Sequence, residues 1–191
     1  MSGIPDGWLM LIPPSLFTVH YHRNASDKSG ADMSGGKHDY FATVLWQRNN
    51  DEKYTDNRYS RAHQWRFDGG VVVAASSSPK VVPLPMSAEA NVDPEEAFIA
   101  ALSSCHMLFF LSYAAQRGFV VDRYEDQAVG TMGRDAQGRT AMLKVTLRPR
   151  ISFSGDKHPS AADIDTLHHR SHDDCFLANS VKTEVVVENP A

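Results

Sequence analysis

The most prominent feature of the hydrophobic pattern is a segment over residues 97–115 that is apolar on almost every side. Asp93 and Pro94 precede it, and Asp at the N-cap with Pro at the first helical position is typical of a helix start. Two glutamates follow, which suit the positive end of a helix dipole, and Gly118 suits a helix stop. We predict a long central helix over residues 93–117, buried on most faces by a sheet on one side and by a second subunit on the other.

Strand patterns lie on both sides of this helix. They are rich in β-branched and aromatic residues, or they alternate between apolar and polar positions as half-buried strands do. The expected strands are residues 40–47, 63–67, 71–76, 124–132, 142–153 and 183–187. A second helix is expected over residues 161–173, with Ser160 as its cap. The order of a β-meander, a helix, strands, a helix and a strand predicts an α+β fold.

Residues 1–37 differ from the rest of the chain, because they contain clusters of Gly, Ser, Pro and Asp and no sustained hydrophobic period. We predict a flexible N-terminal tail followed by one compact domain over residues 38–191. As a hypothesis, residues 1–32 are dispensable, or the natural protein starts at Met33, which opens the sequence Met-Ser-Gly-Gly-Lys-His. A chain of 191 residues fits a single domain.

Composition excludes several classes of partner. The net charge is -4 and 22% of the residues are charged, so neither a nucleic acid nor an anionic membrane is expected to bind. No apolar run is expected to approach the roughly 20 residues of a transmembrane helix. The apolar stretch near the N-terminus lacks a basic region and is broken by Pro13 and Pro14, so a secretory signal is not expected. We therefore expect a cytoplasmic protein, whose thiols stay reduced by default.

The chain has two cysteines, and the first, Cys105, lies inside the predicted central helix. Its helical neighbours are all apolar: Ala101, Leu102, Leu108 and Phe109. A thiol buried in such surroundings is inert, so a small core residue is one interpretation. A reactive Cys105 needs a cation from another element. Arg61, at the entry to a predicted strand, is the best placed by sequence, and the weaker candidates are Arg48, Arg66, Lys144 and Arg148.

Glu95 is a candidate acid for the same site, since a carboxylate could orient an arginine or hold a peroxide proton. The alternative is a glutamate that only complements the helix dipole. Ten residues separate Glu95 from Cys105, which is about 15 Å along a straight helix at about 1.5 Å per residue. The two side chains can share a site only if two copies of the helix pack antiparallel across a dimer interface.

The second cysteine, Cys175, follows Asp173 and Asp174, and adjacent carboxylates raise the pKa of a thiol. Such a cysteine is a poor first nucleophile. It can still act as a resolving cysteine, which attacks a sulfenic acid that has already formed. An isolated cysteine at a helix end is an equal alternative.

Three histidines, His168, His169 and His172, precede Cys175 at spacings that suggest a metal site. A second pair of ligands is missing from the sequence, so an exposed histidine face is the favoured interpretation and no cofactor is expected. His106 follows Cys105, but adjacent side chains on a helix point about 100° apart. A catalytic pair of these two residues is therefore not expected.

The segment Asp93-Pro-Glu-Glu-Ala-Phe…Ala-Leu-Ser-Ser-Cys105, with the later segment Cys175-Phe-Leu-Ala-Asn-Ser180, resembles the OsmC/Ohr family of osmotically inducible and organic hydroperoxide resistance proteins. The likeness covers residues 38–188. It implies an OsmC-like α+β fold in which β-meander sheets surround a long buried central helix. It also implies an intertwined homodimer in which two such helices lie back to back.

The resemblance further implies a thiol peroxidase that reduces organic hydroperoxides to alcohols. Cys105 matches the peroxidatic cysteine of the family and Cys175 the resolving cysteine. Glu95 matches the active-site glutamate, and Arg61 the arginine near the start of the second strand. The implied cycle passes through a Cys105 sulfenic acid and a Cys105–Cys175 disulfide, which a lipoyl-type dithiol reduces. The sites would lie at the subunit interface.

The chain also departs from the family pattern. His106 stands where an aromatic residue is usual, and the insertion over residues 48–57 is long. Two other functions stay open beside the peroxidase. One is a non-catalytic OsmC-like dimer that binds an apolar small molecule, and the other is a metal-binding protein that uses the cluster from His168 to Cys175.

Overall fold

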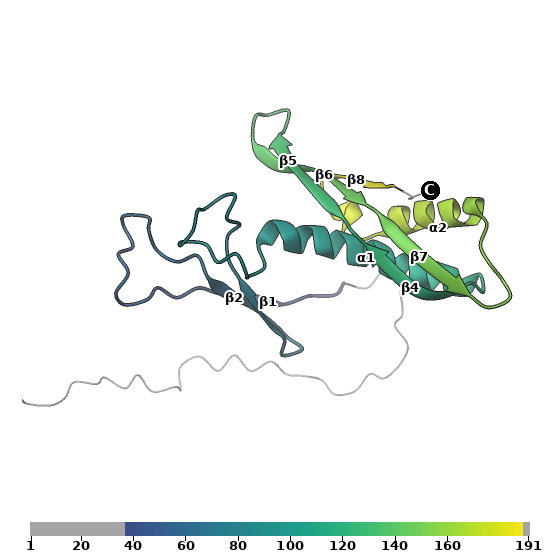
Figure 1. The fold of residues 1–191 in the computed structure, drawn as a ribbon, viewed down its shortest axis with the longest axis horizontal. Helices are drawn as coiled ribbons and strands as arrows, with labels where there is room; N and C mark the ends of the chain where they lie inside the picture. The colour runs from purple at the N-terminus through teal and green to yellow at the C-terminus, as the bar shows by residue number, and fades with distance from the viewer. Residues whose placement is uncertain (1–36, 189–191) are drawn as a thin grey trace, which may run out of the picture. The chain divides into compact units, whose positions relative to one another are not determined.

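The computed structural model describes residues 37–188, so the predictions of a flexible tail and of a start at Met33 fall almost entirely outside the described residues. The elements belong to one compact unit, Phe41–Ala191 (Figure 1). The strands are β1 Ala42–Leu45, β2 His63–Phe67, β3 Val72–Ala75, β4 Val120–Asp126, β5 Val129–Arg134, β6 Thr140–Leu147, β7 Pro149–Ser154 and β8 Glu184–Val187. The helices are α1 Pro94–Gln116, α2 Ala161–Asp174 and a 3-10 turn, η1, Ala178–Ser180.

The strands form three sheets. The first is an antiparallel meander, β1-β2-β3, in which Trp65 on β2 faces Val44 on β1 and Val73 on β3. The second is the antiparallel pair β4-β7, and the third is β5-β6-β8, in which β8 runs parallel to β6. Mixed helices and largely antiparallel sheets confirm the α+β prediction.

The two long strands expected over residues 124–132 and 142–153 are each broken in two, which corrects the sequence-based boundaries. β4 ends at Asp126 before β5 begins, and one residue, Arg148, separates the end of β6 from Pro149, the first residue of β7. Both breaks lie at the same level, because the Arg148 backbone N–H donates to Asp126 Oδ1 at 2.6 Å. Together the four strands make one long bent hairpin, in which β5 and β6 continue into β4 and β7 (Figure 1).

Helix α1 begins and ends where the sequence predicts. The Asp93 side chain accepts from the backbone N–H of Glu96 at 2.8 Å and forms a capping box with it. The chain leaves the helix through Gly118, whose φ of +75° favours glycine. These local signals are strong because each satisfies backbone groups that a helix end leaves unpaired.

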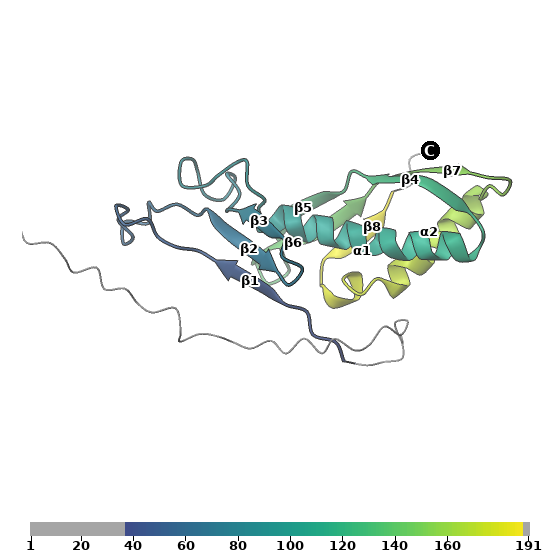
Figure 2. The ribbon, with the colours of Figure 1, turned by 90° about the horizontal axis from the view of Figure 1, so that it is seen from below.

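One face of α1 forms the core of the unit. Two apolar clusters lie along it, one around Leu102 against β6 and the other around Phe110 against α2 and the β4-β7 pair. Figure 2 shows both helices on the same side of β4 and β7. The other face of α1 is open in a single chain, and Leu108 on it is 63% exposed. The predicted burial on most faces is therefore reached on one face only within one chain.

By length and composition α1 could cross a membrane, contrary to the expectation that no segment reaches that length. The core helix of a soluble protein passes the same test. In this structure α1 packs against β4, β5, β6 and α2. Its apolar character is thus used, at least in part, for contacts within the chain.

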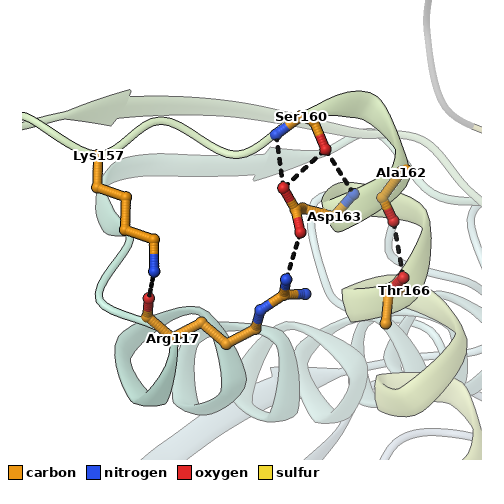
Figure 3. A network of polar contacts seen from close by, with 6 residues as sticks. All are labelled: Arg117, Lys157, Ser160, Ala162, Asp163 and Thr166. Atoms are coloured by element: carbon orange, nitrogen blue, oxygen red, sulfur yellow. Dashed lines mark hydrogen bonds and ion pairs between the residues drawn. The ribbon is translucent and has the colours of Figure 1, made fainter.

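The C-terminal end of α1 is tied to the N-terminal end of α2 by a polar network (Figure 3). The Arg117 guanidinium forms an ion pair with Asp163, whose carboxylate also accepts from the backbone N–H and the hydroxyl of Ser160. Lys157 Nζ donates to the Arg117 carbonyl at 2.6 Å. Ser160 is the cap of α2, as predicted. This end of the helix pair is therefore held in place.

Candidate functional site

Cys105 and Cys175 meet at the contact between α1 and α2. Cys105 lies half-buried in the middle of α1, and Cys175 is the C-cap of α2 with 1% of its surface exposed. The two thiols are neighbours, because the Cys105 thiol acts on the pKa of Cys175. The turn after α2 also contacts the Cys175 sulfur, because the Ala178 backbone N–H donates to Cys175 Sγ at 3.4 Å.

Burial raises the pKa of the Cys175 thiol to about 11, and the neighbouring Cys105 thiol adds to the shift. The backbone N–H groups of Ala178 and Leu177 act in the opposite direction. The raised pKa agrees with the sequence-based expectation, but its cause is different. The Asp174 carboxylate accepts a hydrogen bond from the Tyr113 hydroxyl instead of acting on the thiol. Cys175 is therefore protonated at neutral pH.

Aromatic side chains surround the approach to the two thiols. Phe109 lies four residues after Cys105 on α1 and packs edge-on against Phe176, which follows Cys175, with ring centroids 5.1 Å apart. Phe109 also lies 6.0 Å from the Tyr113 ring. Phe176 remains 59% exposed. The surface beside the thiols is thus apolar and partly open.

A pair of histidines joins the same two helices. His106 Nε2 and His168 Nδ1 are 3.0 Å apart, so one ring nitrogen donates and the other accepts. The rings are nearly parallel, with a 12° angle between their planes, and Phe110 lies 4.6 Å from the His168 ring. Burial, with a contribution from neighbouring histidines, lowers the pKa of His106 to about 3. Burial also lowers the pKa of His168 to about 4.

The predicted exposed histidine face is wrong for His168, which is 4% exposed. His169 is exposed and donates from Nδ1 to the Asp165 carbonyl at 2.8 Å, away from His168. Among residues 37–188, no group of three or more His, Cys, Asp or Glu side chains could hold a metal ion. The open alternative of a metal site from His168 to Cys175 is therefore not supported.

The sequence signal for the histidine pair lay in the helix pattern. Leu102, His106, Phe110 and Ala114 recur every four residues along α1, and all four are buried. This spacing places His106 within an apolar stripe. The partner, His168, lies 62 residues away and carries no local signal that points to it.

Arg61 is held by the loop that precedes β2. Its guanidinium lies over the Tyr59 ring, 3.7 Å from the centroid, and donates to the Tyr59 carbonyl. Nη2 donates to Asn57 twice, to the carbonyl at 3.0 Å and to Oδ1 at 2.7 Å. Asn57 has a φ of +60°, a left-handed conformation that Asn tolerates better than most residues. In the described part of one chain, the hydrogen bonds of the Arg61 side chain go to this loop and none goes to Cys105.

Glu95 lies in the first turn of α1, half-buried. It lines a cavity of about 790 Å³ together with Phe98 of the next turn and the sulfur-bearing Met132 and Met142 of β5 and β6. Because α1 is unbroken between Glu95 and Cys105, the separation of about 15 Å expected from helix geometry applies within a chain. One chain therefore brings Cys105 and Cys175 together and leaves Arg61 and Glu95 elsewhere.

A central helix and a C-terminal helix that bring two thiols together across an α+β fold define a class of dithiol protein. The sequence matches the family model of OsmC-like protein over residues 87–189. The chain belongs to the OsmC-like family. None of the curated proteins matches it.

Solved structures support the same assignment. An OsmC-like protein of unknown function from Vibrio cholerae is 54% identical, with 81% of this chain and 100% of that chain covered and a TM-score of 0.80. An organic hydroperoxide resistance protein from Elizabethkingia anophelis is 15% identical, with coverages of 82% and 99% and a TM-score of 0.59. An organic hydroperoxide resistance protein of Bacillus subtilis is 18% identical, with coverages of 79% and 98% and a TM-score of 0.52. The last two share the fold.

Proposed function

We propose that the protein is a thiol peroxidase that reduces organic hydroperoxides to alcohols, with Cys105 as the peroxidatic and Cys175 as the resolving cysteine. The observation that carries the proposal is the meeting of the two thiols at the α1–α2 contact of one chain. A disulfide needs Cα atoms about 4.4–6.8 Å apart, a separation that neighbouring thiols on two packed helices can reach. Family membership and the fold shared with organic hydroperoxide resistance proteins also support it.

The proposed cycle has three steps. The Cys105 thiolate attacks the distal oxygen of the hydroperoxide, the O–O bond breaks, and the alkoxide takes up a proton and leaves as the alcohol. The Cys175 sulfur then attacks the sulfenic sulfur of Cys105, the S–O bond breaks, and water leaves with the proton of the Cys175 thiol. Finally an external dithiol of the lipoyl type reduces the disulfide by two exchanges and is itself oxidised to a disulfide.

The raised pKa of Cys175 fits the second position in this cycle. A thiol with a pKa of about 11 is rarely a thiolate at neutral pH, so it competes poorly with Cys105 for the peroxide. Once Cys105 has become a sulfenic acid, its sulfur is a good electrophile for Cys175. The two sulfurs are neighbours, so the attack is intramolecular. Phe109 and Phe176 favour apolar organic hydroperoxides over hydrogen peroxide at this surface.

Arg61 and Glu95 complete the site in a homodimer under this proposal. The distance from Glu95 to Cys105 along α1 excludes a direct contact within one chain, and the open face of α1 offers a surface for a second copy. A guanidinium beside Cys105 would stabilise its thiolate. A carboxylate beside that guanidinium would fix its orientation. The cycle needs a reducing compartment, so we propose a cytoplasmic location.

Thiol counting by mass spectrometry tests the proposal. Reduced protein is treated with cumene hydroperoxide or tert-butyl hydroperoxide, alkylated and digested. We expect the loss of both free thiols and a bridged peptide pair containing Cys105 and Cys175. If both thiols remain alkylatable after millimolar peroxide, the peroxidase proposal is wrong. Addition of dihydrolipoamide should restore both thiols and support repeated turnover.

A second candidate function is binding of an apolar small molecule without catalysis. The cavity of about 790 Å³ beside Glu95 favours it, since Phe98, Met132 and Met142 are among its lining residues. The 54% identical relative has no known function. A fluorescent fatty-acid probe that binds saturably to protein whose thiols do not react with peroxide would favour this candidate over the peroxidase.

A further inference from the structure

The proposed cycle makes no use of the buried histidine pair, although both of its members neighbour the cysteines. His106 directly follows Cys105 on α1. His168 lies seven residues before Cys175, and residues seven apart share one face of a helix. The pair therefore crosses the same helix contact as the two thiols.

The pair is the most buried polar link between the two helices. His106 is 1% and His168 is 4% exposed. The other polar links are more exposed: the Arg117 side chain that pairs with Asp163 is 39% exposed, and the Asp174 side chain that accepts from Tyr113 is 49% exposed. Hydrogen bonds at exposed positions compete with water, whereas a buried polar contact is costly to lose.

Both rings are neutral near pH 7, because burial lowers the pKa of each. A neutral imidazole has one donor and one acceptor nitrogen, so the 3.0 Å contact satisfies one nitrogen on each ring. Apolar side chains alone let one helix slide along another with little penalty. A directional hydrogen bond between the helices does not, since a small slide leaves two buried nitrogens unpaired.

We propose that His106 and His168 are positioning residues for disulfide formation: their hydrogen bond holds α1 and α2 in the arrangement in which the Cys105 and Cys175 thiols meet. This positioning role rests on the proposed function for its use in the cell. It can nevertheless be measured without a peroxide, because it concerns how readily the two thiols pair.

Two double variants separate the hydrogen bond from the packing. In His106→Leu/His168→Leu the pair becomes apolar and the directional contact is lost. In His106→Gln/His168→Asn an amide pair replaces it, since the Gln amide reaches about as far as Nε2 and the Asn amide about as far as Nδ1. Leu147→Ala is the matched control, because it weakens the core between α1 and β6 without touching the α1–α2 contact.

The measurement is the equilibrium of each full-length variant with reduced and oxidised glutathione. The protein dithiol gives two electrons and two protons to oxidised glutathione, which becomes two reduced glutathiones while the Cys105–Cys175 disulfide forms. Alkylation and intact mass give the fraction with the internal disulfide. Thermal unfolding, followed by circular dichroism, reports stability in parallel.

We expect the apolar pair to lower the equilibrium constant for the internal disulfide by about tenfold or more, since the thiols then meet less often. The amide pair should stay within about threefold of the wild type, and so should Leu147→Ala even though its melting temperature falls. A purely structural role would instead make the equilibrium constant follow the melting temperature across all variants. Such a correlation, or an apolar pair that matches the wild type, overturns the positioning role.

Two further results keep the tests separate. If the apolar pair does not fold, the single variants His168→Leu and His168→Asn make the same comparison, because only the second retains an acceptor and donor for His106. If the wild type forms the disulfide with glutathione but ignores peroxide, the proposed peroxidase fails. The positioning role is then still decided by the glutathione series.

Discussion

The α1–α2 contact and the β1-β2-β3 sheet contain different candidate site residues. Those at the helix contact lie together, whereas Arg61 beside the sheet lies apart from them. At the helix contact, the thiols of Cys105 and Cys175 already meet, and the histidine link beside them is buried. The sheet side carries Arg61, whose side-chain hydrogen bonds go to its own loop. Under the proposed function, one chain thus brings together the two cysteines that form the disulfide, whereas the groups that would activate Cys105 lie elsewhere.

The two regions also differ in how much apolar surface they leave exposed in a single chain. The sheet leaves large apolar side chains open in a single chain, and Val44 and Phe67, which are 66% and 41% exposed, lie on the same face. Large apolar side chains that are exposed together on one face are typical of a surface that another protein covers. We infer that a second copy covers it and, in doing so, brings Arg61 and Glu95 to the thiols.

The largest effects should come from the cysteines themselves. Cys105→Ser should reduce peroxide consumption to the rate without protein, because no sulfenic acid can form. Cys175→Ser should permit one turnover, after which Cys105 is oxidised further to the sulfinic acid. Intact mass after stepwise addition of peroxide distinguishes the two variants. Normal turnover of Cys175→Ser with a dithiol would show that the helix contact does not perform the resolving step.

The next effect tests whether the sheet needs a second copy. Val44→Asp places a carboxylate on the open face of β1, and an unpaired charge buried at an interface costs several kcal/mol. We expect the dimer dissociation constant to rise by about a hundredfold or more, as measured by light scattering over a dilution series. The control is Val120→Asp on β4, where the valine is 51% exposed.

In this pair of variants, peroxidase activity should fall only in the variant whose dimer dissociates. If Val44→Asp dissociates the dimer and leaves the rate of Cys105 oxidation unchanged, one chain contains the complete site. The comparison between a self-contained helix contact and a dependent sheet would then fail. The Val120→Asp variant should keep both the dimer and the rate, because its strand belongs to the other part of the fold.

A smaller effect is expected from Arg61→Ala. Loss of the cation should slow the reaction of Cys105 with peroxide by about 10- to 100-fold, because less thiolate is present. Stopped-flow measurements of the first oxidation step isolate this effect from disulfide formation. The glutathione equilibrium of the cysteine pair should hardly change. An unchanged oxidation rate would mean that another cation, such as Arg66 or Arg148, activates the thiol.

Acid should affect the helix contact before the sheet. His106 and His168 have folded-state pKa values of about 3 and about 4, against an ordinary value of 6.5. Below pH 6.5 the unfolded chain binds more protons than the folded one, so stability falls as the pH falls towards 4. The loss should reach about 2 kcal/mol per histidine between pH 7 and pH 5. Urea unfolding of His106→Gln/His168→Asn should show a flatter pH dependence in that window.

Local signals in the sequence predicted the elements whose ends they define. Asp93 and Gly118 fix the ends of α1, and Ser160 fixes the start of α2, because a cap acts on its own helix. The breaks in the two long strands could not be predicted in this way. They depend on a contact between Asp126 and Arg148, which lie 22 residues apart and pair only in the folded hairpin.

For the candidate site too, features with a local sequence signal could be predicted and features that depend on distant residues could not. Both cysteines could be singled out from their surroundings and from the family resemblance. The cause of the Cys175 pKa could not, since burial and Cys105 act through the tertiary fold while the Asp174 carboxylate accepts from Tyr113. The histidine pair joins residues 62 positions apart. The roles of Arg61 and Glu95 stay predictions, because they depend on a second copy of the chain.

The smallest expected effect concerns how the loop holds Arg61. Asn57→Gly keeps the left-handed backbone and the carbonyl acceptor, and it removes only the Oδ1 acceptor 2.7 Å from Nη2. The guanidinium keeps its place over Tyr59, so we expect the first oxidation step to change by only about two- to fivefold. A slower step means that the loop presents Arg61 ready for use. A faster step means that the loop stores Arg61 away from the thiol, and that the second copy must compete with Asn57 for it.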